Sequence, residues 1–230
     1  MKKRTKIIIT ISPKLIKKNP IETLVKAGAD ILRINTKYMP LKKYSVLINE
    51  LNKKKDYEIL IDIKDRKNIS QLKNINFDYL AISFAENPKE IQKIKRLFSK
   101  KIKIISKIES KKGVNNIDKL ISVSDGIMIA RGDLGNSFPI EKIPLIQKLI
   151  TLKCNKKNKF SITATEMMIS MLNHKRPSRA EVTDITNAIL EGSDALLLAE
   201  ETAIGKNPIL AIKTMSKIII ETEKYLKDLK

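Results

Sequence analysis

Short apolar runs rich in β-branched residues recur along the chain, separated by helix-length segments. Most of these runs are continuously apolar, which is typical of strands buried on both faces of a parallel sheet. Their spacing, about 20 to 35 residues, predicts eight strands with a helical segment after each. The predicted strands are Lys6–Ile11, Asp30–Asn35, Glu58–Ile63, Tyr79–Phe84, Ile102–Ile108, Asp125–Ala130, Phe160–Ala164 and Ala195–Glu201.

Helix start signals lie between the predicted strands. In Asn19-Pro20-Ile21-Glu22 and Asn87-Pro88-Lys89-Glu90, an N-cap residue precedes a first-turn proline and a glutamate. Ser178-Arg179-Ala180-Glu181 has the pattern of a capping box, and Gly28 and Gly192 are expected helix stops. Further helices are predicted over Leu41–Lys54, Ser70–Ile75 and Ile143–Leu152, and after Asn207-Pro208.

This alternation predicts a single α/β domain over residues 1–230, a (β/α)₈ or TIM barrel. No linker or low-complexity segment interrupts it. The alternative is an open doubly wound sheet, which would need a glycine-rich phosphate turn after the first strand. Ile11-Ser12-Pro13-Lys14 is not such a turn, so the sequence favours the barrel.

The net charge of +21 raises the question of nucleic-acid binding. The charge is mostly scattered lysine, and no basic stripe interleaved with aromatic residues is present. A compositional drift toward Lys, Ile and Asn explains it better, so we expect no nucleic-acid partner. We also expect no membrane segment, and the lone Cys154 fits a reducing compartment, so the predicted location is the cytoplasm.

Polar residues stand at the carboxyl ends of the predicted strands, where such barrels carry their active sites. Several are spaced two apart and therefore project from the same face of their strand. In a barrel these groups converge on one mouth. They are Thr10, Arg33 with Asn35, Asp62 with Lys64, Ser83, Lys107 with Glu109, Asp133, Thr163 with Thr165, and Glu201.

These residue types predict a metal and phosphate site. Glu109 and Asp133 offer hard oxygen ligands from neighbouring strand ends, which suits Mg²⁺ or Mn²⁺. Lys107 is placed to neutralise a transferring phosphoryl group or an enolate, and Arg33 to clamp phosphate oxygens. The amides after Arg131 could hold a carboxylate, and Thr165 could position a group for proton transfer.

Eight recognisable segments are spread over most of the chain: TKIIITISP, GADILRINT, ISKIES, SKKGVNNID, SDGIMIARGDLGN, ITATEMM, RPSRAEVTDITNAILEGSDALLL and EETAIGKNP. Together they resemble the catalytic barrel of the pyruvate kinase family. The resemblance implies that Lys107 is the transition-state cation, that Arg33 binds phosphate, and that Glu109 and Asp133 ligate Mg²⁺.

The family's other roles fall on further matching residues. Gly132, Asp133 and Thr165 would hold the carboxylate of phosphoenolpyruvate, with Thr165 also on the proton path to the enolate. Asn35 would bind phosphate on the nucleotide side together with Thr10, and Asn35 and Asp62 would lie near K⁺.

The chain departs from the family on the nucleotide side. The family's lid domain follows the third strand, whereas here only residues 64–78 separate Ile63 from Tyr79, and the family's C-terminal domain is also expected to be absent. The family patterns DTKGPEIR, RxNFSHG and SGET read here DIKDRKNI, RINTKYM and AEET. These changes remove a threonine and a serine ligand of K⁺ and a nucleotide-contacting arginine. Lys37 could take the place of K⁺.

Three functions are compatible with a matching substrate side and an altered nucleotide side. The first is a minimal pyruvate kinase that converts phosphoenolpyruvate and ADP to pyruvate and ATP, with slow turnover because no lid excludes water. The second is metal-dependent enolisation or decarboxylation of pyruvate or oxaloacetate. The third is a non-catalytic, degenerate member of the family. The resemblance also suggests a homodimer through the barrel, near the segment from Arg176 to Glu181, with a cap network of Arg176, Arg179 and Glu181 within one chain as the alternative.

Overall fold

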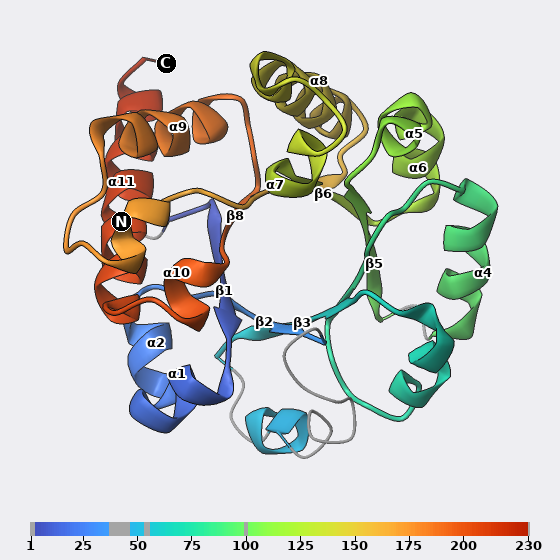
Figure 1. Cartoon of the computed structure of the whole chain (residues 1–230), viewed down its shortest axis with the longest axis horizontal. Helices are drawn as coiled ribbons and strands as arrows, with labels where there is room; N and C mark the ends of the chain where they lie inside the picture. Colours follow the sequence, from blue (N-terminus) through green and yellow to red (C-terminus); the bar gives the residue numbers. More distant parts are fainter. Residues whose placement is uncertain (1–2, 37–46, 53–55, 99–100, 230) are drawn as a thin grey trace.

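The computed structural model describes residues 3–36, 47–52, 56–98 and 101–229. Eight parallel strands form a closed barrel in chain order, with helices around it (Figure 1). The predicted (β/α)₈ barrel is therefore confirmed. The strands are β1 (Lys6–Ile11), β2 (Ile31–Asn35), β3 (Glu58–Ile63), β4 (Tyr79–Ile82), β5 (Lys103–Ile108), β6 (Gly126–Ala130), β7 (Phe160–Ala164) and β8 (Ala195–Leu198).

Helices or helical turns follow each strand. The predicted helix Leu41–Lys54 is described only in part, and residues 47–51 are helical. The others are α1 (Pro13–Lys18), α2 (Ile21–Ala27), η1 (Arg66–Leu72), α4 (Pro88–Leu97), α5 (Lys111–Asn115), α6 (Ile117–Val123), α7 (Arg131–Gly135), η2 (Ile140–Lys142), α8 (Ile143–Lys156), η3 (Ile169–Leu172), α9 (Arg179–Leu190), α10 (Glu200–Ala203) and α11 (Pro208–Asp228).

Two predicted strands are too long at their carboxyl ends. The fourth ends at Ile82 because the backbone turns at Ser83 and Phe84, where Phe84 adopts a left-handed φ of 48°. The eighth ends at Leu198, and Glu201 belongs to α10 rather than to the strand. In both places apolar or mixed sequence continues beyond the last residue of the strand, so the sequence pattern does not show where the strand ends.

Two helix predictions also need correction. Asn19 is the C-cap of α1, a helix that the sequence analysis missed, and the N-cap of α2 is Pro20. The helical turn after β3 covers Arg66–Leu72 instead of Ser70–Ile75, because Asp65 caps it earlier by accepting from the amide of Lys67. The caps at Asn87 and Ser178 and the stop at Gly28, with φ 122°, are as predicted.

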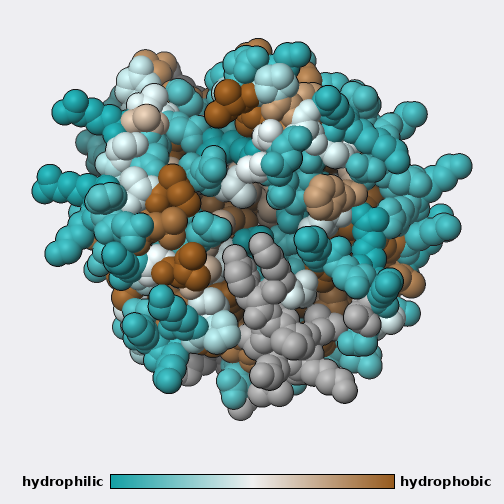
Figure 2. All heavy atoms as spheres, viewed as in Figure 1, coloured by the Kyte–Doolittle hydropathy of each residue, from teal (hydrophilic) through white to brown (hydrophobic). Residues whose placement is uncertain are grey.

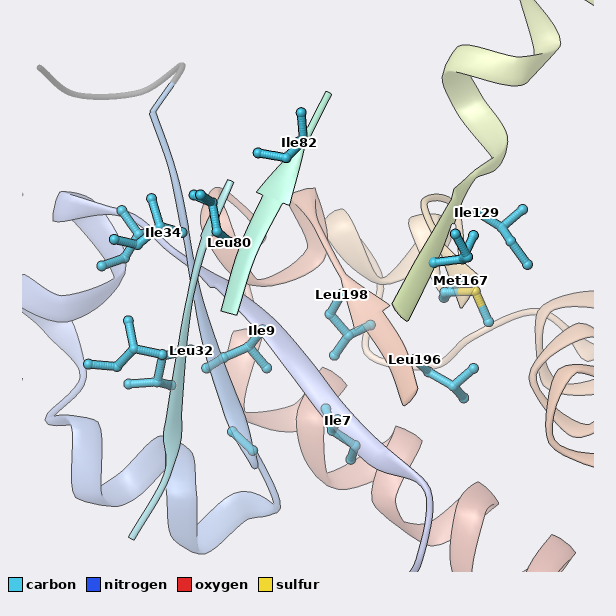
Figure 3. Packing of buried hydrophobic residues seen from close by; sticks show 14 of the residues in the cluster. Ile7, Ile9, Leu32, Ile34, Leu80, Ile82, Ile129, Met167, Leu196 and Leu198 are labelled. Carbon is cyan, nitrogen blue, oxygen red and sulfur yellow. The ribbon is translucent and has the colours of Figure 1, made fainter. Parts of the chain in front are cut away.

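The core has two layers, as the alternation of side chains along each strand requires. Inward side chains fill the barrel interior, among them Ile8, Ile31, Leu60, Ile105 and Met128. The outward side chains pack against the helices, and Figure 3 shows part of this outer layer. Its labelled members are Ile7, Ile9, Leu32, Ile34, Leu80, Ile82, Ile129, Met167, Leu196 and Leu198.

The face seen in Figure 2 is mostly hydrophilic, with hydrophobic residues in small separate patches. In the part of the chain that the structure describes, no helix combines the length and apolarity that crossing a bilayer requires.

The reactivity of the Cys154 thiol can be used to test how tightly α8 packs against the barrel. The thiol is fully buried, and burial raises its pKa to about 12, with a further contribution from Asp194. Because the thiolate is the reactive form, we expect a disulfide reagent at pH 8 to react with the folded chain about 100-fold more slowly than with the urea-unfolded chain. A Ser122→Cys variant, with its new thiol at an exposed position, is the control and should react at once. Equal rates for both thiols would contradict this packing.

The stability of the start of α9 depends on pH through the carboxylate of Glu181. This carboxylate accepts from the amides of Ser170 at 2.8 Å and Ser178 at 2.7 Å. Burial acts to raise the pKa of Glu181, but these hydrogen bonds and that of the Ser170 hydroxyl outweigh it and lower the pKa below its ordinary value. The stabilisation is therefore present above the unfolded-state pKa and lost as the pH falls through the folded-state pKa.

We expect Glu181→Gln to lower the free energy of unfolding by about 1 kcal/mol at pH 7. The difference from wild type should shrink at acidic pH, where Glu181 becomes protonated. Urea unfolding at both pH values measures this, with the exposed Glu141→Gln as a control that should change little. A difference of the same size at both pH values would exclude the carboxylate as its source.

Candidate functional site

The predicted polar residues of β2, β3 and β5 extend the inward rows of the barrel core. Arg33, Asp62 and Lys107 lie two residues beyond the inward Ile31, Leu60 and Ile105. They therefore point into the carboxyl-terminal end of the barrel. All three are buried, with Asp62 only 1% exposed.

Asp62 is the centre of this charge cluster. Its Oδ2 accepts from Arg33 Nε at 2.9 Å and Nη2 at 2.7 Å, and its Oδ1 accepts from Lys107 Nζ at 3.2 Å. Burial acts to raise the pKa of Asp62, but the charges of Arg33 and then Lys107 lower it below its ordinary value. One ionised carboxylate thus fixes two cations on different strands.

Lys107 is held on three sides. Its ammonium lies 2.9 Å from Glu109 Oε1 and 3.0 Å from Ser83 Oγ, in addition to its contact with Asp62. Burial acts to lower the pKa of Lys107, but the charges of Asp62 and then Glu109 outweigh it and raise the pKa above its ordinary value. Lys107 is therefore a fixed cation rather than a proton donor at neutral pH.

Glu109 lies at the end of β5 and is 3% exposed. Its Oε2 accepts from the amide of Phe84 at 2.5 Å, while Oε1 faces Lys107. Burial raises the pKa of Glu109 above its ordinary value, although the charge of Lys107 and the hydrogen bond from the Phe84 amide act to lower it. Asp133 is exposed on α7. The two predicted metal ligands thus follow neighbouring strands, Glu109 directly after β5 and Asp133 on the short helix after β6.

The short helix α7 and the end of β7 meet at Thr165. The amide of Gly132 donates to Thr165 Oγ1 at 2.8 Å, and Thr165 Oγ1 donates to the carbonyl of Ala164 at 2.6 Å. Thr165 has a left-handed φ of 73°. Arg131 holds this conformation by donating to the Thr165 carbonyl from Nη2 at 2.7 Å, while it is paired with Asp184 of α9.

Other predicted residues have a supporting position. Thr10 is 1% exposed, and its Oγ1 accepts from Arg33 Nη1 at 2.7 Å, so it orients that guanidinium. Asn35 ends β2 opposite Asp62 and is partly buried. Lys64 is exposed beyond the end of β3. Lys37 lies outside the described residues.

Two residues predicted at the mouth are elsewhere. Thr163 faces outward and its hydroxyl is 2.7 Å from that of Ser193, because the inward row of β7 is Ile162 and Ala164. Glu201 accepts backbone hydrogen bonds from Met168 at 3.0 Å and Ala199 at 2.8 Å. It therefore ties α10 to the turn after β7, and this structural role replaces the predicted place on the rim.

The sequence predicted Ser83 at the mouth without a role for it, and it gave Phe84 and Arg66 no place in the site. Ser83 could have been found from its spacing, because it lies two residues beyond the inward Ala81. Arg66 is one of only seven arginines in a lysine-rich chain, and the planar, forked guanidinium is suited to contacts that lysine cannot make, which is the one signal that could have pointed to it. Nothing in the sequence indicated the backbone turn at Phe84.

The donor set agrees with a hard divalent cation. Among the residues that the structure describes, no group of three or more His, Cys, Asp or Glu side chains is placed to hold a metal ion. Mg²⁺ usually takes one or two carboxylates and fills its other positions with water and substrate oxygens. Glu109 and Asp133 supply two such carboxylates, so the residues present fit this ion only when a ligand or water completes its shell.

The fold and these side chains define a class, the (β/α)₈ barrels that gather charged residues at the carboxyl-terminal mouth. Within that class, the family described as pyruvate kinase, barrel domain, matches residues 45–212 of this chain. The chain belongs to the pyruvate kinase family.

Individual pyruvate kinases are similar in sequence to this chain as well. The chain is 46% identical to a pyruvate kinase of Clostridium perfringens over 167 residues, which is 71% of this chain and 35% of the relative. It is 41% identical to a pyruvate kinase of Thermotoga maritima over 210 residues, which is 90% of this chain and 42% of the relative. The matched part thus spans about two fifths or less of these curated relatives.

The charge cluster makes a direct prediction about stability. Asp62→Asn leaves Arg33 and Lys107 buried without their shared counter-ion, so we expect a loss of about 3 kcal/mol in the free energy of unfolding. The control is Asp118→Asn, which breaks the surface pair with Lys153 at 2.5 Å and should cost less than about 1 kcal/mol. Urea unfolding of both variants checks this. Equal losses would show that the buried cluster adds no more than a surface ion pair.

Proposed function

We propose that the chain transfers the phosphoryl group of phosphoenolpyruvate to ADP, giving pyruvate and ATP, with Mg²⁺ or Mn²⁺ as cofactor. The observation that carries this proposal is the position of Lys107. Its ammonium is fixed between Asp62, Glu109 and Ser83 on the inward face of the barrel. Such a preorganised cation stabilises charge that develops on a transferring phosphoryl group and on an enolate oxygen.

The other residues would divide the substrate between them. Arg33 would bind the phosphoryl group, since its guanidinium is already oriented by Asp62 and Thr10. Gly132, Asp133 and Thr165 would hold the carboxylate of phosphoenolpyruvate. When the phosphoryl group leaves the enol oxygen for the terminal phosphate of ADP, an enolate remains, and Thr165 would belong to the path that delivers a proton to its methylene carbon.

Glu109 and Asp133 would hold the divalent cation, which when bound neutralises charge on phosphoryl and carboxylate oxygens. For K⁺ we propose Asn35 and Asp62, although both oxygens of Asp62 already face Arg33 and Lys107. The alternative that we propose is that the ammonium of Lys37 takes the place of K⁺, in which case the rate would not depend on added K⁺.

The part of the site that would bind the nucleotide rests on fewer residues. Thr10 is almost completely buried and serves Arg33, so its part in nucleotide binding, with Asn35, would be indirect. Residues 64–78 join β3 to β4 through the short 3₁₀ helix η1, which leaves no inserted lid domain in that connection. We therefore expect weak ADP binding and slow turnover, because water reaches the reacting groups.

We also propose that the chain acts in the cytoplasm as a homodimer. Neither nucleic acid nor a membrane is a partner in this proposal. A specific observation favours contact through the barrel: α8 and the preceding η2 expose several large apolar side chains. They are Ile140, Leu145, Leu149 and Leu152.

A coupled assay for pyruvate from phosphoenolpyruvate and ADP with Mg²⁺ tests the proposed function. We expect Lys107→Met to lower the rate by about 100-fold or more. Lys103→Met is a matched control, because Lys103 lies at the opposite end of the same strand and stacks over Tyr79 with its ammonium 5.2 Å from the ring centroid. Its rate should equal that of wild type.

A rate that is the same in Lys107→Met and wild type would exclude Lys107 as the catalytic cation. Proton exchange at the methyl group of pyruvate without nucleotide, together with no transfer to ADP, would favour the enolising alternative. Absence of Mg²⁺-dependent phosphoenolpyruvate binding in the folded chain would favour the non-catalytic one.

A further inference from the structure

The turn that ends β4 presents two groups to the mouth of the barrel. The amide of Phe84 donates to Glu109 Oε2 at 2.5 Å, and the hydroxyl of Ser83 lies 3.0 Å from Lys107 Nζ. The next amide, that of Ala85, donates to the carbonyl of Lys107 at 3.1 Å. This turn therefore contacts both Lys107 and Glu109: the amides of Phe84 and Ala85 donate, whereas the Ser83 hydroxyl accepts from the Lys107 ammonium.

The conformation of the turn is unfavourable in isolation. Phe84 has φ 48°, in the left-handed region that residues with a β-carbon adopt only when surrounding contacts hold them there. Its side chain is 46% exposed, so packing of the ring does not impose this geometry. The contacts that hold the turn must come from its backbone.

Arg66 supplies these contacts from the other side. Its Nη2 donates to the carbonyl of Ser83 at 2.7 Å and to that of Phe84 at 2.9 Å, and its Nη1 is paired with Glu90 of α4. Arg66 is the first residue of η1, in the short connection between β3 and β4. One planar guanidinium thus joins this connection, the β4 turn and α4.

We propose that Arg66 is a positioning residue: by fixing the Ser83–Phe84 turn, it aims the Phe84 amide at Glu109 and the Ser83 hydroxyl at Lys107. Arg66 itself points at backbone carbonyls and acts through the turn. If its task were only to link η1 to α4, the ion pair with Glu90 would be the contact that matters. The two carbonyl contacts and the ion pair can be separated by mutation.

Hydrogen exchange at the Phe84 amide tests the proposal without any activity. We expect exchange at least tenfold faster in Arg66→Met, because the turn is released, and no change in the control Arg96→Met, whose arginine is exposed on α4. Glu90→Gln leaves both carbonyl contacts intact and should stay within threefold of wild type. Arg66→Lys keeps one donor group without the fork and should be intermediate.

Exchange in Arg66→Met within twofold of Arg96→Met would overturn the proposal, as would a loss of protection in Glu90→Gln equal to that in Arg66→Met. If Arg66→Met does not fold, Arg66→Lys decides: the same protection as wild type overturns the need for the fork, and intermediate protection supports it.

The consequence for the site is measured with Mn²⁺ alone. We expect Arg66→Met to bind Mn²⁺ about tenfold more weakly than Arg96→Met, because residues that orient a ligand typically contribute this much. This part rests on the proposed function, in which Glu109 is a metal ligand. A wild-type chain that binds no Mn²⁺ would contradict that function, whereas the exchange experiment would still decide the role of Arg66.

Discussion

The mouth of this barrel depends on the ion pairs that the buried carboxylate of Asp62 forms with Arg33 and Lys107. Arg33 and Lys107 come from different strands, and neither could remain buried without a counter-ion, because an unpaired charge in the interior is strongly destabilising. Asp62 faces both, one oxygen to each. Glu109 adds a second negative charge beside Lys107. The position of every charged group at the centre of the mouth follows from this arrangement.

Around this cluster the backbone is held in unfavourable conformations. Four non-glycine residues of the described chain have a positive φ, and three of them, Phe84, Thr165 and Glu166, follow strand ends at the mouth. Arginines contact the carbonyls of these turns, Arg66 after β4 and Arg131 after β7. Each guanidinium is anchored in turn by an acidic residue of a neighbouring helix, Glu90 or Asp184. Strain near a site therefore coincides with rigid support, as is common where groups must be preorganised.

The sequence predicted the barrel well because its signals are local. Continuous β-branched runs indicate buried parallel strands, and the caps at Asn87 and Ser178 depend on residues within one helical turn. Spacing of two residues along a strand was enough to place Arg33, Asp62 and Lys107 on one inward face. The same rule failed for Thr163 and Thr165, because β7 ends between them and the left-handed backbone at Thr165 turns that side chain separately.

What the sequence by itself determined is the architecture, the family and the identity of the charged residues at the strand ends. Only the tertiary structure decided how these residues share their partners: that Asp62 bridges two cations, that Thr10 supports Arg33, and that Glu201 fastens backbone instead of facing the mouth. It also revealed Arg66 behind the β4 turn. The physical reason is that strand and helix signals arise from neighbours in the chain, whereas ion pairs and side-chain contacts to backbone carbonyls join residues far apart in sequence. Their partners are fixed only once the barrel has closed.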